Sequence, residues 1–263
     1  MHPKTQAGRA SVSGPRAPRR VRRFVALTSS LGLVLVAFLG SVTPASAARI
    51  VGTISGYLNL ENPVWAEAKD PKAKSYTFRE MVPTVPAQYR RLYPQVNKEV
   101  CVALLGSAAV NAGAPITVKV GGGRTTPVTL VATPGTKLIF QNVDAFPHRL
   151  YGVGMKEFTV SEMARGARRE WSVPAPGSYE IRDELAPSLR MWVVSEANLV
   201  EQTFPSLKGE YSFTVEAPGE YQVQAFFAGH KVGPAVPVTL AARDVGLAPL
   251  AIATAKKEAG KAE

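Results

Sequence analysis

The sequence predicts an all-β protein built from sandwich-like sheets, and three observations support this class. After residue 47 the chain consists of short runs rich in β-branched and aromatic residues. Turns separate these runs, and the chain holds 22 glycines and 21 prolines to build them. Only one or two segments have a helical pattern. Many short strands punctuated by glycine and proline are typical of sandwiches and barrels.

The first segment, residues 1–47, is predicted to be a signal peptide. It carries seven Lys and Arg residues and no acid, and these precede an apolar stretch at 24–42. The motif Ala45-Ser46-Ala47 then supplies the small-x-small pattern of a cleavage site. A retained membrane anchor is the alternative, because ~18 apolar residues approach a bilayer span. Three polar residues from Thr28 interrupt the run and favour the signal peptide.

Export determines how charge and cysteine content are interpreted. The formal net charge is +11, but the signal segment supplies +7 of it and leaves +4 for the rest, so nucleic acid is not an expected partner. The predicted location is the periplasm or the exterior. A single cysteine allows no internal disulfide, and Cys101 lies in an apolar run that predicts a buried small side chain.

Residues 48–126 are predicted to form an N-terminal β region with an irregular excursion. Strands are expected at 50–56, 100–105 and 116–120, and a flexible turn at 121–123. The stretch 64–96 mixes charges, prolines and aromatics without a clean period, and a short helix is expected in it around 87–92.

The remaining segments are predicted to form two strand-rich units and a tail. In the unit 127–197, strands are expected at 128–132, 136–140, 149–153, 169–173, 178–181 and 191–194. In the unit 198–241, strands are expected at 209–215, 220–226 and 236–240. Residues 242–263 are rich in alanine and lysine and are expected to be a frayed or disordered tail.

Two stretches of the unit 127–197 resemble a known family. The run Pro134-Gly135-Thr136-x-Leu138-x-Phe140-x-Asn142-x-Asp144-x-Phe146-Pro147-His148 resembles the stretch of plastocyanin-like (cupredoxin) domains that leads to their first histidine copper ligand. The order of parts resembles plastocyanin-like proteins associated with methylamine utilisation, in which a carboxypeptidase-regulatory-like β unit follows the cupredoxin. The resemblance implies a cupredoxin-like Greek-key sandwich for 127–197 and a smaller regulatory-like β unit for 198–241.

The loop that carries the other copper ligands in this family is degenerate in this chain. The frame Pro176-Gly177 and the strand 192–194 are kept, but Asp183, Ala186 and Leu189 stand where the family has cysteine, histidine and methionine. A type 1 copper site needs a thiolate and two imidazoles. The resemblance therefore implies that no cofactor is bound, and the alternative is copper or another divalent metal in an altered site.

His148, Asp183 and Glu184 are the candidate metal ligands of such an altered site. Two carboxylates and an imidazole form a hard donor set that suits zinc or another divalent ion. The alternative for His148 is a polar side chain held by hydrogen bonds in the loop.

The sequence favours an exported, non-catalytic binding or structural protein. It contains no nucleophile elbow, no His-Glu-x-x-His motif and no carboxylate pair in an apolar setting, so an enzyme is not expected. Two alternatives remain open, a periplasmic metal-binding or electron-transfer protein and a carbohydrate- or envelope-binding module. The expected partner is an envelope protein or a glycan, with no membrane span after signal cleavage. The aromatics expected in the core are Trp171, Tyr179, Trp192 and Phe226, although an exposed pair would form a sugar-stacking platform.

The first testable prediction concerns processing of the chain. The mature protein should begin at or near Ala48, because the cleavage pattern ends at Ala47. N-terminal sequencing of the protein recovered from the periplasm or medium checks this. Recovery of a chain that still begins before Phe24, from the membrane fraction, would contradict it.

Overall fold

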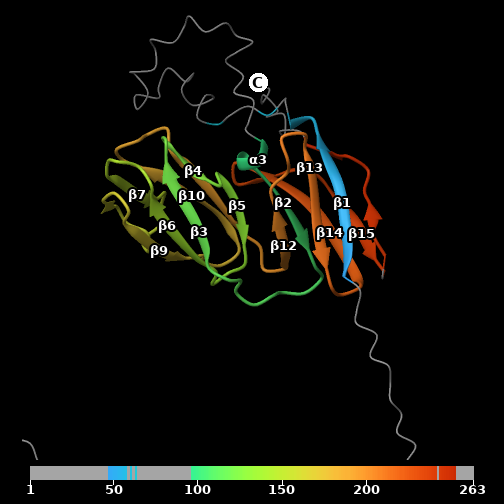
Figure 1. Cartoon of the computed structure of the whole chain (residues 1–263). Helices are drawn as coiled ribbons and strands as arrows, with labels where there is room; N and C mark the ends of the chain where they lie inside the picture. Colours follow the sequence, from blue (N-terminus) through green and yellow to red (C-terminus); the bar gives the residue numbers. More distant parts are fainter. Residues whose placement is uncertain (1–46, 58–59, 61–62, 64–95, 242, 253–263) are drawn as a thin grey trace, which may run out of the picture. The chain divides into compact units, whose positions relative to one another are not determined.

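The computed structural model describes residues 47–57, 60, 63, 96–241 and 243–252. The predicted signal peptide, the helix expected around 87–92 and the end of the predicted tail lie outside these residues. Among the described residues, no helix has the length and apolar character to cross a bilayer. Nearly every helix or strand in the described part is a strand, which confirms the all-β prediction (Figure 1).

Strands account for nearly every element, and the short helix α3 (Val96–Glu99) precedes the second strand. The strands are β1 (Ala48–Ser55), β2 (Val100–Leu105), β3 (Ile116–Gly121), β4 (Arg124–Thr126), β5 (Thr129–Ala132), β6 (Lys137–Asn142), β7 (His148–Gly152), β8 (Ser161–Met163), β9 (Arg168–Ser172), β10 (Gly177–Asp183), β11 (Arg190–Ser195), β12 (Leu199–Thr203), β13 (Glu210–Val215), β14 (Gly219–Phe227), β15 (His230–Leu240), β16 (Val245–Gly246) and β17 (Leu250–Ala251). The strands expected from the sequence are all present, and β4, β8, β12, β16 and β17 are additional. The turn expected at 121–123 is also present, with Gly122 and Gly123 at φ +62° and +72°.

The first sandwich consists of two sheets with the strand orders β4-β3-β6-β9 and β5-β11-β10-β7-β8. Successive side chains of β6 point alternately into the core of this sandwich and away from it. Leu138 and Phe140 are fully buried, whereas Lys137 is exposed. Leu150 on β7 and Ile181 on β10 belong to the same cluster of buried side chains. This two-sheet sandwich is the architecture that the resemblance implied.

The second sandwich consists of the sheet β12-β2-β14-β15 and a sheet in which β1 pairs with β13 on one side and with β16 and β17 on the other. Ile50, Phe213 and Val223 lie in its core. Residues 245–246 and 250–251 fall inside the segment expected to be a tail, yet they pair in parallel with β1. Leu250 is 1% exposed in the core, and this burial holds the segment in place.

Strand pairing crosses the predicted segment boundaries. Strands β3 and β4 precede residue 127 but pair within the first sandwich, whereas β1 and β2 pair with strands that follow residue 198. Figure 1 shows β1 and β2 in the group that contains β13 and β14. Local sequence patterns do not reveal which distant strands will pair, so this pairing was not predicted. The division of the chain at 126/127 and 197/198 stays a prediction.

A seam of buried side chains joins the two sandwiches. Its members are Cys101, Ala103, Leu105, Val131, Val194, Leu199 and Phe226, with Phe204 packed against them. Strand β5 ends its sheet, so its outer backbone groups need partners. The N–H of Val131 donates to Oε1 of Gln202 at 3.1 Å, and Oγ1 of Thr129 accepts from the N–H of Ala228 at 3.1 Å.

Cys101 is fully buried in this seam, which confirms the expectation of a buried small side chain. Its Sγ contacts Oε1 of Gln202 at 3.4 Å. Burial raises the pKa of the thiol to about 12, although a backbone hydrogen bond from Val131 lowers it in part. The thiol is therefore a neutral packing group at physiological pH.

Stability should fall with alkaline pH because of Cys101. The unfolded thiol loses its proton near a pKa of about 8.5, while the folded thiol keeps it up to about 12, so the unfolded state binds fewer protons in this window. The free energy of unfolding should then decrease by about 2 kcal/mol between pH 8 and pH 10, as measured by urea titration. The variant Cys101→Ala should have a visibly flatter pH dependence. Equal slopes for the two proteins would contradict the burial of the thiol.

Candidate functional site

The candidate site lies at the end of the first sandwich where three loops meet. These are the turn between β3 and β4, the loop 143–147 between β6 and β7, and the loop 184–189 between β10 and β11. Asn142, the last residue of β6, shapes the second loop. Its Nδ2 donates to the carbonyls of Phe146 at 2.9 Å and Met163 at 2.8 Å, and its Oδ1 accepts from the N–H of Asp144 at 2.9 Å.

His148 and Asp183 are brought into direct contact, as their places in the aligned motifs suggested. His148 begins β7 and is fully buried, and its Nδ1 lies 2.5 Å from Oδ2 of Asp183. The other oxygen of Asp183 accepts three backbone N–H groups, from Arg149 at 3.2 Å, Leu185 at 2.7 Å and Ala186 at 3.2 Å. Asp183 is 2% exposed, so this carboxylate is buried with its hydrogen-bonding capacity nearly filled.

Asp144 completes the group from the opposite side of the ring. Its Oδ2 lies 3.1 Å from Nε2 of His148, and its carboxylate accepts the N–H of Gly122 at 2.9 and 3.0 Å. Asp144 belongs to the run that resembles the family, but the sequence predicted no role for it. The available signal was its position four residues before His148 in the same loop.

The Asp–His–Asp network (Asp144, His148 and Asp183) therefore ties all three loops together. Each ring nitrogen of His148 faces one carboxylate oxygen, Nδ1 that of Asp183 and Nε2 that of Asp144. The imidazole acts as a bridge between two acids.

Glu184, the third predicted ligand, is directed elsewhere. Its carboxylate pairs with Arg149 at 2.9 Å, and the two side chains are 40% and 44% exposed. The neighbouring Arg182 pairs with Glu180 at 2.8 Å. Glu184 thus takes part in a surface ion pair that contributes at most about 1 kcal/mol to stability.

The residues present do not fit a type 1 copper centre. Asp183 offers a carboxylate where the resemblance expects a thiolate, the side chain of Ala186 has no donor atom, and Leu189 is fully buried in the apolar core. Within the described ranges, no group of three His, Cys, Asp or Glu side chains has the arrangement needed to hold a metal ion. Cys101 lies in the seam, with its Sγ against Gln202, and not among the residues of the network. Both ring nitrogens of His148 face carboxylate oxygens, which leaves neither of them for a metal.

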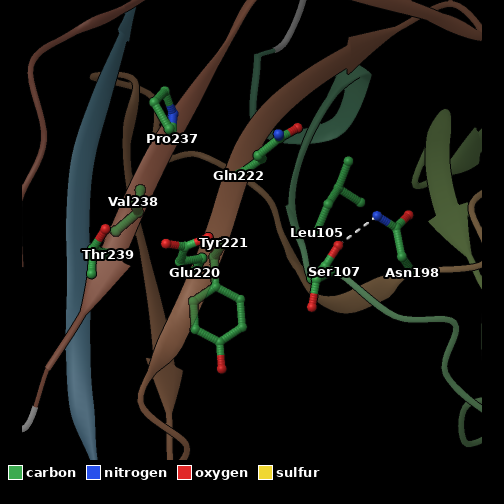
Figure 2. A pocket seen from close by; sticks show the side chains of 10 residues that line it. Leu105, Ser107, Asn198, Glu220, Tyr221, Gln222, Pro237, Val238 and Thr239 are labelled. Carbon is green, nitrogen blue, oxygen red and sulfur yellow. Dashed lines mark hydrogen bonds between the residues drawn. The ribbon is translucent and has the colours of Figure 1, made fainter.

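The second sandwich carries a separate surface hollow of about 350 Å³ (Figure 2). Glu220 and Gln222 on β14 and Thr239 on β15 line one side of it and are exposed. Ser107 and Asn198 lie on the other side, where Nδ2 of Asn198 donates to the carbonyl of Gly106 at 2.7 Å. This hollow is an open polar surface of the sheet.

The aromatic side chains lie mainly in the cores, as expected. Phe226 is fully buried and Trp171 is 5% exposed, while Tyr179 and Trp192 are partly buried against the cores. These four aromatics do not form a flat exposed platform.

Comparisons with known proteins give structural similarity at low identity. No protein-family model matches the chain, and no curated protein matches its sequence. A Cu-containing nitrite reductase from Thermus scotoductus is similar at 22% identity and a TM-score of 0.29, over 34% of this chain and 25% of the reductase.

Two smaller solved proteins are similar over nearly their whole length. A purple cupredoxin from Nitrosopumilus maritimus has 19% identity and a TM-score of 0.27, over 31% of this chain and 99% of its own. A variant of amicyanin in its Cu(I) form has 18% identity and a TM-score of 0.28, over 36% of this chain and 98% of its own. The fold of this chain is established by its own strand pairing.

Removing the buried carboxylate should destabilise the protein strongly. Asp183→Ala leaves a buried imidazole and three backbone N–H groups without their acceptor, so the free energy of unfolding should drop by about 3–5 kcal/mol. The adjacent Glu184→Ala is the matched control and should cost less than about 1 kcal/mol, because its ion pair is half exposed. Chemical denaturation of the two variants measures both values. Similar losses in the two proteins would disprove the structural role of Asp183.

Proposed function

We propose that this chain is an exported, non-catalytic binding protein on a cupredoxin-like scaffold that has lost its type 1 copper ligands. The observation that carries the proposal is the Asp–His–Asp network. A carboxylate occupies the position of the soft thiolate donor and is itself engaged by His148 and by three backbone N–H groups. Hydrogen bonds in this network hold together the loops that a metal organises in a copper protein.

The buried position of His148 supports a role without catalysis. A general base must come within hydrogen-bond reach of its substrate. His148 is fully buried, and both of its ring nitrogens are already in contact with carboxylate oxygens. The imidazole therefore contributes to the stability of the loops and not to proton transfer with a ligand.

The proposed setting is the periplasm or the exterior, and the proposed partner is an envelope protein or a glycan. The support for export is the basic run, the apolar stretch and the cleavage pattern of residues 1–47. Residues 198–241, which contribute β12, β13, β14 and β15 to the second sandwich, are proposed to correspond to the carboxypeptidase-regulatory-like β unit of the methylamine-utilisation-associated proteins. The support is the order of the parts along the chain.

Copper titration tests this proposal directly. The native protein mixed with Cu(II) should develop no thiolate-to-copper charge-transfer band, because the Cys101 thiol is buried in the seam and no thiol belongs to the network. The triple variant Asp183→Cys, Ala186→His and Leu189→Met should restore the soft ligand set and become coloured with one copper per chain. The variant Asp183→Cys alone is the control and should bind copper far more weakly.

Two results would overturn parts of the proposal. An intense charge-transfer band in the native protein would contradict ligand loss and favour an electron-transfer role. A triple variant that folds, as judged by circular dichroism, but binds no copper would show that these three positions do not correspond to the ligand positions.

A further inference from the structure

The predicted cleavage bond lies directly beside a buried strand. It joins Ala47, which is exposed, to Ala48, which begins β1 and is 3% exposed. Hydrolysis adds water across this peptide bond and leaves a carboxylate on Ala47 and an α-ammonium group on Ala48. The first residue of the product therefore belongs to the core of the second sandwich.

Strand β1 is held along both of its edges. On one side Ala48, Arg49 and Ile50 pair with β13 (Figure 1). On the other side the N–H of Arg49 donates to Oδ1 of Asp244 at 2.8 Å, and Ile50 pairs with Val245 of β16. The side chain of Ile50 is fully buried. The three residues that follow the bond are thus fixed by the sheet and by the core.

Proteolysis requires this segment to leave the sheet. A protease binds the chain in an extended form on both sides of the bond that it cleaves, and a folded segment becomes available to it only through local opening. Release of β1 breaks its pairing with β13, β16 and β17 and withdraws Ile50 and Ile54 from the core. Such opening costs more free energy than the fraying of a chain end, so few molecules are open at any time.

The order of the strands along the chain delays the pairing of β1. Its partner β13 begins at Glu210, and Asp244 follows Arg49 by 195 residues. At about 5–20 residues per second, synthesis of that stretch takes roughly 10–40 s. The strands that pair with β1 are therefore made last. The bond is accessible in the growing chain and becomes protected only when these strands arrive.

We infer that the Ala47–Ala48 bond is cleaved before β1 enters its sheet, so that signal peptidase acts on the unfolded chain and the folded precursor is not its substrate. The chain then crosses the membrane unfolded, and insertion of β1 between β13 and β16 follows cleavage. A precursor that folds first keeps residues 1–47. This order of processing and folding rests on the export proposed above.

Cleavage of the purified precursor, residues 1–263, by signal peptidase in detergent tests this order. Refolded precursor should be cleaved at least about a hundredfold more slowly than precursor diluted from urea directly into the reaction, because cleavage follows the fraction of open molecules. N-terminal sequencing of the products identifies the bond that is cleaved.

A spacer variant isolates the contribution of β1. It carries Ala-Arg followed by four Gly-Ser repeats between Ala47 and Ala48, which keeps the residues around the bond and moves the bond away from the strand. When folded, this variant should be cleaved as fast as the diluted precursor. The matched control carries the same insertion between Ala108 and Ala109, which are exposed in the loop between β2 and β3, and should stay resistant. Circular dichroism checks that each folded sample is folded.

The outcomes separate this order from the proposed export. Equal rates for the refolded and the diluted precursor would overturn it, and so would a resistant spacer variant, because β1 would then not be what protects the bond. A loop control as sensitive as the spacer variant would attribute the effect to lost stability and would also overturn it. Absence of cleavage at 47–48 in every sample would refute the predicted signal peptide, and with it both the export and the order.

Discussion

The burial of β2 on both faces is the constraint on which the rest of the structure depends. Val100, Val102 and Leu104 enter the core of the second sandwich, whereas Cys101, Ala103 and Leu105 enter the seam. Both faces are apolar, so polarity alone does not distinguish them. The seam face carries two small side chains, Cys101 and Ala103, beside Leu105. The neutral, buried thiol of Cys101 is a consequence of this arrangement.

The seam also provides hydrogen-bond partners for the edge strand β5. Strand β5 would expose unpaired backbone groups, which is a risk for association with other chains. The side chain of Gln202 accepts one of these groups, the N–H of Val131, and the N–H of Ala228 donates to the side-chain hydroxyl of Thr129 on the same strand. The first sandwich is therefore completed by residues that follow it in the sequence, and the two sandwiches support each other.

A polar network holds together three loops of the first sandwich. A buried carboxylate is stabilising only when its lone pairs are met by donors. Asp183 accepts three backbone N–H groups, Asp144 accepts the N–H of Gly122, and His148 lies between the two carboxylates. The three loops at this end of the first sandwich are thus held together by hydrogen bonds.

The sequence by itself determined the all-β class, the positions of most strands, the turn at Gly122 and Gly123, and the alignment that puts Asp183 opposite His148. These features depend on local alternation, on turn residues and on spacing along the chain. Only the tertiary structure decided that β1 and β2 join strands more than a hundred residues later, that Asp144 bonds the second ring nitrogen, and that Glu184 turns to Arg149. Alternation specifies which face of a strand is apolar but not which strand will cover it, and a carboxylate's partner depends on loops that meet only after folding.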